Sequence, residues 1–197
     1  MGPFGMPPLL LACLRAVGLS CCLAWPCWAQ SPVATALPAV PSLPEALTKL
    51  EPSLAHRSQS RYTYFGFDVY LVSLWTAPDF QPEAGENQRL ALELNYLRPF
   101  AATDIAKRSL QEMRRVRAFS AAQEKQWLSD MEQVFPNVRK GDRLLGLHRP
   151  GESAVFWHNG EPRGEIRDPE FARLFFGIWL SPRTSAPALR EALLAPP

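Results

Sequence analysis

The sequence predicts an α+β fold in which a long antiparallel β-sheet is backed by a layer of helices. Segments rich in β-branched and aromatic residues alternate in groups with segments whose apolar residues have helical spacing. The order is strands, a helix pair, strands again and a second helix pair, which is typical of helices packed on one face of an antiparallel sheet. The chain has 197 residues, 47% of them apolar, which is enough for one domain with a sizeable core.

The first 29 residues have the pattern of a secretory signal peptide. Arg15 is their only charge, an uncharged apolar run follows at residues 16–25, and Cys27 and Ala29 occupy the −3 and −1 positions of a cleavage site. Ala34–Ala36 is a second such site, and a lipid attached at Cys21 or Cys22 and a transmembrane anchor are the alternatives. The run is shorter than the roughly 20 residues of a spanning helix, so we expect export to the periplasm.

All four cysteines of the chain belong to this segment. Its removal leaves 168 residues with a net charge of +1 and no thiol. The mature domain is then expected to be stabilised by its core, without disulfides, and it has no cysteine to act as a nucleophile or a metal ligand.

Strands are expected after a proline-rich arm. The arm, residues 30–54, carries five prolines, which predicts an extended chain, part of which can pair as an edge strand. The composition of residues 62–65 and 69–75 favours strands, and apolar residues alternate with others across residues 90–96. We expect the last of these strands to bury one face and expose the other to water.

Two helices and a second group of strands follow. Residues 102–116 have an apolar side and a charged side, and Ser120 with Gln123 predicts a capping box for a helix that Pro136 ends. The next strands are expected at 143–149, 154–158 and 161–166, the last two joined by the turn Asn159–Gly160.

The chain is expected to end in a second helix pair. Asp168 is the predicted N-cap of a helix that Pro169 opens, and the apolar residues from Phe171 to Leu180 predict that this helix is mostly buried. Residues 185–194 are expected to form a short final helix.

Several function classes have no support in the sequence. It contains no dinucleotide-binding, phosphate-loop, G-x-S-x-G or H-E-x-x-H motif, and a net charge of +2 gives no reason to expect a nucleic-acid partner. His148 and His158 could meet across a hairpin, but without a third ligand they and His56 are expected to be ordinary structural histidines. We therefore expect no metal and no cofactor.

The helix at 102–116 has a basic side. Its cations are explained by a solvated helix face, and contact with an anionic membrane surface or an acidic partner is the alternative. The five residues are Lys107, Arg108, Arg114, Arg115 and Arg117. The many aromatic residues of the domain are expected either in its core or around an apolar cleft between sheet and helices.

Arg61 and Tyr70 lie on neighbouring strand segments near the start of the fold. A guanidinium and a phenol that face an apolar cleft could hold a carboxylate or a phenolate by charge-assisted hydrogen bonds. The alternative is that Arg61 is exposed, as is usual for an arginine near the start of a strand.

Four blocks of sequence, in order, resemble the chalcone isomerase-like proteins of bacteria. The resemblance covers roughly residues 55–195, and the blocks are 61–75 (RYTYFGFDVYLVSLW), 135–143 (FPNVRKGDR), 156–160 (FWHNG) and 171–180 (FARLFFGIWL), followed by 185–194 (SAPALREALL). It implies the open-faced β-sandwich of chalcone isomerase, a long antiparallel sheet backed by a helical layer with an apolar cleft between them.

The polar residues of the plant enzymes are only partly matched. Those enzymes close a flavanone ring with an arginine, a threonine, and a tyrosine, a lysine and an asparagine on a helix. Tyr70 stands where the threonine would be and Lys107 matches the lysine, but Asp104 replaces the tyrosine and Gln111 replaces the asparagine. The fatty-acid-binding branch of the fold holds a carboxylate with an arginine and a tyrosine, and Arg61 with Tyr70 resembles that pair more closely.

The resemblance therefore implies a binder of a small apolar molecule with an acidic head, such as a fatty acid, held by Arg61 and Tyr70. The alternative is an isomerase, or intramolecular lyase, acting on a flavonoid-like enone with Arg61, Tyr70 and Lys107. A third alternative is a structural or partner-binding protein, in which a phenylalanine or tryptophan fills the space between Arg61 and the helices.

Overall fold

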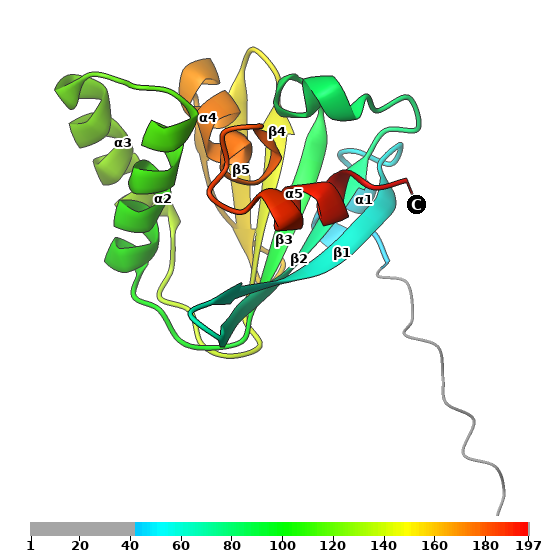
Figure 1. Cartoon of the computed structure of the whole chain (residues 1–197), viewed down its shortest axis with the longest axis horizontal. Coiled ribbons are helices and arrows are strands. Elements are labelled where there is room, and N and C mark those ends of the chain that lie inside the picture. Colours follow the sequence, from blue (N-terminus) through cyan, green and yellow to red (C-terminus); the bar gives the residue numbers. More distant parts are fainter. Residues whose placement is uncertain (1–41, 197) are drawn as a thin grey trace, which may run out of the picture. The chain divides into compact units, whose positions relative to one another are not determined.

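The computed structural model describes residues 42–196 and confirms the α+β fold (Figure 1). Six strands form one antiparallel sheet whose spatial order is the order of the sequence. They are β1 (Ala55–Tyr64), β2 (Phe67–Thr76), β3 (Leu90–Tyr96), β4 (Arg143–Arg149), β5 (Ser153–His158) and β6 (Glu161–Ile166). The predicted signal peptide lies outside the described residues.

Four helices build the layer that covers one face of the sheet. They are α2 (Ala102–Val116), α3 (Ala121–Val134), α4 (Pro169–Leu180) and α5 (Pro187–Leu194). Helix α2 packs between α3 and α4, and α5 lies along β1. A short 3-10 helix, η1 (Pro82–Asn87), interrupts the connection from β2 to β3 and contacts α4. The expected helix pairs are therefore present.

Local sequence signals fix the ends of these elements as predicted. The Ser120 hydroxyl accepts a hydrogen bond from the backbone of Gln123, whose side chain bonds back to Ser120, so the capping box of α3 is complete. Asp168 caps α4 through the backbone N–H groups of Glu170 and Phe171. Asn159 has a φ of 51° and Gly160 a φ of 89°, as a type I′ turn requires.

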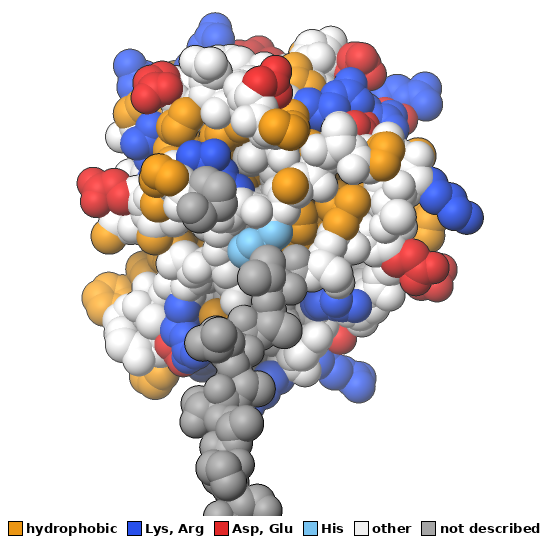
Figure 2. All heavy atoms as spheres, turned by 90° about the vertical axis from the view of Figure 1, so that its right-hand side faces the viewer, with side chains coloured by type: hydrophobic (Ala, Val, Ile, Leu, Met, Phe, Trp, Pro, Cys, Tyr) orange, Lys and Arg blue, Asp and Glu red, His pale blue; other side chains and the backbone are white. Residues whose placement is uncertain are grey.

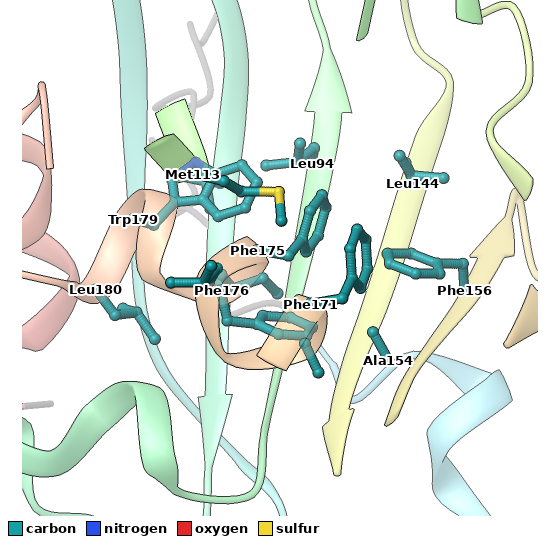
Figure 3. Close-up of a cluster of buried hydrophobic side chains, with 14 of the residues drawn as sticks. Leu94, Met113, Leu144, Ala154, Phe156, Phe171, Phe175, Phe176, Trp179 and Leu180 are labelled. Atoms are coloured by element: carbon teal, nitrogen blue, oxygen red, sulfur yellow. The ribbon is translucent and has the colours of Figure 1, made fainter. Parts of the chain in front are cut away.

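The main core lies between the sheet and α4 (Figure 3). Phe171 and Phe175 stack with ring centroids 5.5 Å apart, and Phe156 of β5 meets Phe175 edge-on at 5.3 Å. A Cβ on Gly146 of β4 would come within 3.2 Å of Phe176 and 3.3 Å of Phe156. The missing side chain of this glycine is what lets the aromatic residues of α4 approach the sheet.

The other face of the sheet carries a smaller core, which corrects two expectations. Trp75, Leu145 and Trp157 pack there against Leu47 of α1 (Glu45–Thr48). The described part of the proline-rich arm thus forms a one-turn helix, not an extended chain. Because α1 covers this face of the sheet, Ala91 of β3 is buried there, although the sequence predicts that this face of β3 is exposed to water.

Within the described part of the chain, no helix is both long enough and apolar enough to cross a membrane. On the face shown in Figure 2, positive and negative side chains are scattered among apolar ones. This mixed surface agrees with the small net charge of the chain.

Candidate functional site

A cavity of about 450 Å³ opens between the β1–β3 end of the sheet, α2, α4 and the segment that leads into α5. Its wall is mostly apolar and aromatic, with Leu94, Phe100, Ile105, Phe175, Ile178 and Leu189 among its residues. A volume of this size falls in the range of small-molecule sites, about 300–1,000 Å³. The cavity is open and is not filled by the protein's own side chains.

Tyr70 of β2 stands at the inner side of this cavity. Its ring stacks on that of Tyr62, the residue directly opposite on β1, with centroids 5.0 Å apart. Its hydroxyl accepts a hydrogen bond of 3.1 Å from the indole N–H of Trp179 on α4. Among the described residues no acceptor takes the hydroxyl proton of Tyr70, so this phenol can donate to a bound molecule.

The tyrosines of the site are held in the neutral form. Burial raises the pKa of Tyr70 far above the ordinary value, and burial also raises the pKa of Tyr96 on β3. Burial raises the pKa of Tyr62 as well, although the positive charge of Arg108 acts in the opposite direction. A phenol that stays protonated can donate a hydrogen bond but is a poor general base.

Arg108 of α2 is the cation of the cavity wall nearest to these tyrosines. It is close enough to Tyr62 for its positive charge to oppose the rise in that group's pKa, and its guanidinium lies 5.2 Å from the ring centre of Tyr64. It also forms an ion pair with Glu112, one turn along α2, at 2.8 Å. Glu112 has a second partner in Arg115, at 3.5 Å. Arg108 can therefore turn toward a bound anion without leaving the buried Glu112 carboxylate without a cation.

Arg61 does not line this cavity, so the structure does not bring the predicted Arg61–Tyr70 pair together there. Tyr62 points toward Tyr70, and side chains alternate along a strand, so Arg61 projects to the opposite face of the sheet. There its exposed guanidinium forms an ion pair with Asp68, and Arg61 does not line the cavity. The alternative expectation, an exposed arginine, is what the structure has.

Lys107, the third predicted site residue, is exposed on α2 and does not line the cavity either. Its neighbour Arg108 does, together with Asp104, Ser109 and Glu112. In the sequence, the spacing of the five cations on this helix is explained by a solvated face. Nothing in that spacing told which residue of the basic side turns toward the sheet.

The histidines form no metal site. In the β4–β5 hairpin, His148 pairs with Ala154 and His158 pairs with Leu144, so the two histidines lie at opposite ends. His148 is buried, and its Nδ1 lies 2.8 Å from the backbone oxygen of Gln88. Among the described side chains, no group of three histidine, cysteine or acidic residues could hold a metal ion.

Comparison with known proteins identifies a family, a relative and a solved structure. A profile of the family described as chalcone isomerase-like matches residues 55–195. An uncharacterized protein of Haemophilus influenzae is 27% identical over 139 residues, which cover 68% of this chain and 65% of that protein. The chain thus matches slightly less than two thirds of the length of this relative.

One solved structure with the same fold is a fatty-acid binding protein of Arabidopsis thaliana. It aligns with a TM-score of 0.55 over 72% of this chain and 85% of that chain, at 10% sequence identity. The structural alignment shows that the two proteins share a fold, the open antiparallel sheet backed by helices that the sequence predicts. At an identity this low it shows the fold alone.

Proposed function

Because the chain belongs to the chalcone isomerase-like family, we propose that it is a non-catalytic binder of a small apolar acid such as a fatty acid. The observation that carries this proposal is the composition of the 450 Å³ cavity, whose apolar wall surrounds one cluster of a guanidinium and two neutral phenols. An apolar molecule with a single anionic head matches both parts of that cavity.

The head group would lie between Arg108 and Tyr70. Tyr62 connects the two residues, since its phenol is close to the charge of Arg108 and its ring stacks on Tyr70. A carboxylate there would accept a charge-assisted hydrogen bond from the guanidinium and a second one from the free proton of the Tyr70 hydroxyl. The chain of the ligand would then follow the apolar wall toward Phe175 and Ile178.

Two features favour binding over catalysis. The isomerase alternative needs Arg61, Tyr70 and Lys107 around one substrate, and two of these three residues lie outside the cavity. Tyr70, the remaining one, has a strongly raised pKa, which suits a hydrogen-bond donor and not a base. The Arabidopsis protein with the same fold is a fatty-acid binding protein, which is consistent with the proposed ligand class.

Native mass spectrometry of the protein, purified from cells without detergent, tests the proposal. We expect a population of the protein to carry the additional mass of one fatty acid, and we expect the Arg108→Gln variant to carry less of it. A chalcone incubated with the protein should lose its enone absorbance at the spontaneous rate. Acceleration of that loss would support the isomerase and would contradict a non-catalytic binder.

We also propose that the chain is exported to the periplasm, with residues 1–29 as its signal peptide. This rests on the sequence pattern of those residues. Intact-mass measurement of protein from the periplasmic fraction of an expressing bacterium is expected to give a chain that begins at Gln30. A full-length chain that stays in the cytoplasmic fraction would contradict export.

A further inference from the structure

The tip of the β1–β2 hairpin exposes three aromatic side chains that lie within four residues of one another in the sequence. Tyr64 is 46% exposed, Phe65 is 83% exposed and Phe67 is 61% exposed. In the described part of the chain, Leu50 is the one other large hydrophobic residue of comparable exposure. Large apolar side chains gathered on one projecting turn indicate a contact with something apolar outside the domain.

The backbone conformation at this tip is unfavourable for Phe65. Phe65 has a φ of 48° and Gly66 a φ of 77°, so both turn residues occupy the left-handed region. The same two-residue geometry recurs at Asn159 and Gly160, with φ values of 51° and 89°, and there the sequence has the residues that this turn favours. A phenylalanine in this conformation is destabilised by crowding of its Cβ. Phe65 therefore weakens the turn and, being exposed, contributes little to the core.

Two arginines flank the aromatic tip. The guanidinium of Arg98 lies 5.1 Å from the ring centre of Phe67, and that of Arg108 lies 5.2 Å from the ring centre of Tyr64. Among the side chains that the structure describes, no carboxylate forms an ion pair with Arg98. Aromatic side chains with arginines beside them are the combination that anchors proteins at the surface of an anionic bilayer, with rings among the acyl chains and guanidinium groups at the phosphates.

The tip is also the rim of the cavity. Tyr64, Phe65 and Phe67 are exposed and line the cavity at the same time, with Arg98 and Arg108 beside them. Figure 1 shows the hairpin reaching past the body of the sheet to the end of α2 at which that helix begins. A molecule that enters or leaves over this rim passes along aromatic side chains.

We infer that the β1–β2 hairpin tip inserts Phe65 and Phe67 into an anionic lipid bilayer, so that the cavity opens toward the membrane. This contact would let an apolar acid pass between the bilayer and the cavity. That role rests on the proposed function. A protein partner would account for the exposed rings as well. The lipid surface accounts in addition for the unpaired Arg98 and for the position of the rings on the rim of an apolar cavity.

Hydrogen–deuterium exchange of the full chain, freed of bound lipid, tests the insertion with a readout confined to the hairpin. The peptide that spans residues 61–69 is followed with vesicles of phosphatidylcholine mixed with phosphatidylglycerol, with vesicles of phosphatidylcholine alone, and without vesicles. We expect the mixed vesicles to slow exchange at the tip and phosphatidylcholine alone to have little effect. Flotation of the same samples measures how much protein is bound.

The Phe65→Asn variant makes the tip resemble Asn159–Gly160, so it should fold at least as well as the natural chain. We expect it to lose the protection of the hairpin and to bind mixed vesicles about tenfold more weakly, since Phe65 is the most exposed aromatic ring at the tip and would bury the most apolar area in the bilayer. Its urea midpoint should be unchanged or higher. Leu50→Asn is the matched control, because it removes a similarly exposed apolar side chain elsewhere and should leave vesicle binding as it is.

The inference would be overturned if mixed vesicles did not slow exchange at the hairpin. It would also be overturned if they slowed exchange equally in the natural chain and in Phe65→Asn. Protection by a protein from the same cells, with none by vesicles, would assign the tip to a protein partner instead. Titration of the natural chain with laurate in the absence of vesicles tests the proposed function separately. A protein that binds laurate and ignores vesicles contradicts only the membrane contact, and one that binds vesicles and ignores laurate contradicts only the proposed ligand.

Discussion

Tyr62 and Tyr70 face each other across β1 and β2, with their rings stacked 5.0 Å apart inside the cavity. This one pairing decides which cation can serve the site. It turns the neighbouring Arg61 to the other side of the sheet, and it leaves Arg108 of α2 in contact with the phenol of Tyr62. The guanidinium that could hold an acidic ligand therefore comes from the helical layer and not from the strand.

Tyr70→Phe should lower both stability and ligand affinity. The hydroxyl is the acceptor for the indole N–H of buried Trp179, and a buried donor left without an acceptor costs about 1–3 kcal/mol of unfolding free energy. Urea denaturation measures this loss. Tyr62→Phe is the control, because the Tyr62 hydroxyl accepts no hydrogen bond from a buried indole, and it should change stability by less than about 0.5 kcal/mol. Equal stability of the natural chain and Tyr70→Phe would contradict the role of this hydrogen bond.

Asp168→Ala should be among the more destabilising changes at a helix end. Asp168 caps α4 and also accepts a hydrogen bond of 2.7 Å from the indole N–H of buried Trp127 on α3. Loss of a cap costs about 1 kcal/mol and an unpaired buried donor about 1–3 kcal/mol, so we expect a total of about 2–4 kcal/mol.

Ser120→Ala provides the comparison for this prediction, because the Ser120 hydroxyl caps α3 at an exposed position and should cost only about 1 kcal/mol. Chemical denaturation of the two variants gives the difference. If Asp168→Ala costs no more than Ser120→Ala, the bond between α3 and the cap of α4 contributes nothing to stability.

Acidification should reduce stability through His148. Burial, with the nearby charge of Arg89, holds the pKa of His148 below its ordinary value, so the unfolded chain takes up a proton more readily than the folded protein. The effect is absent above about pH 6.5, and the unfolding free energy falls as the pH drops below that value.

The free energy that His148→Gln costs should therefore be smaller at about pH 5.5 than at about pH 7.5, which urea denaturation at the two pH values measures. Burial also lowers the pKa of His56, so His56→Gln supplies the second comparison. A cost of His148→Gln that is the same at both pH values would mean that the folded and unfolded chains protonate this histidine alike.

Elements with strong local signals could be predicted from the sequence. Strands β4 and β6 and helix α2 have the predicted bounds, because turn residues beside the strands and apolar periodicity along the helix mark where they begin and end. Asn159–Gly160 and the cap residue Asp168 needed no tertiary information. The helix at α1 could not be predicted, since it is four residues long and follows a proline, and its stability comes from burial of Leu47 on the sheet.

The site was predicted only in part. Tyr70 was recognised as a cleft residue, but the facing of Arg61 depends on strand register, and register follows from the pairing of Tyr62 with Tyr70. In the sequence, Arg108 belongs to the basic face of a solvated helix and Trp179 to the apolar residues of a mostly buried one. Their roles come from the way α2 and α4 pack over β2, which the periodicity of each helix alone does not specify.

Calorimetric titration with laurate and with dodecanol tests the central proposal most directly, because the two molecules differ in their head group and share the same apolar chain. We expect Arg108→Gln to weaken laurate binding by about ten- to a hundredfold, as the loss of a charge-assisted hydrogen bond predicts, and to leave dodecanol binding unchanged. Arg61→Gln, which removes an exposed arginine outside the cavity, should bind laurate like the natural chain. Laurate affinity that survives Arg108→Gln, or that is lost in Arg61→Gln, would contradict a carboxylate site at Arg108 and Tyr70.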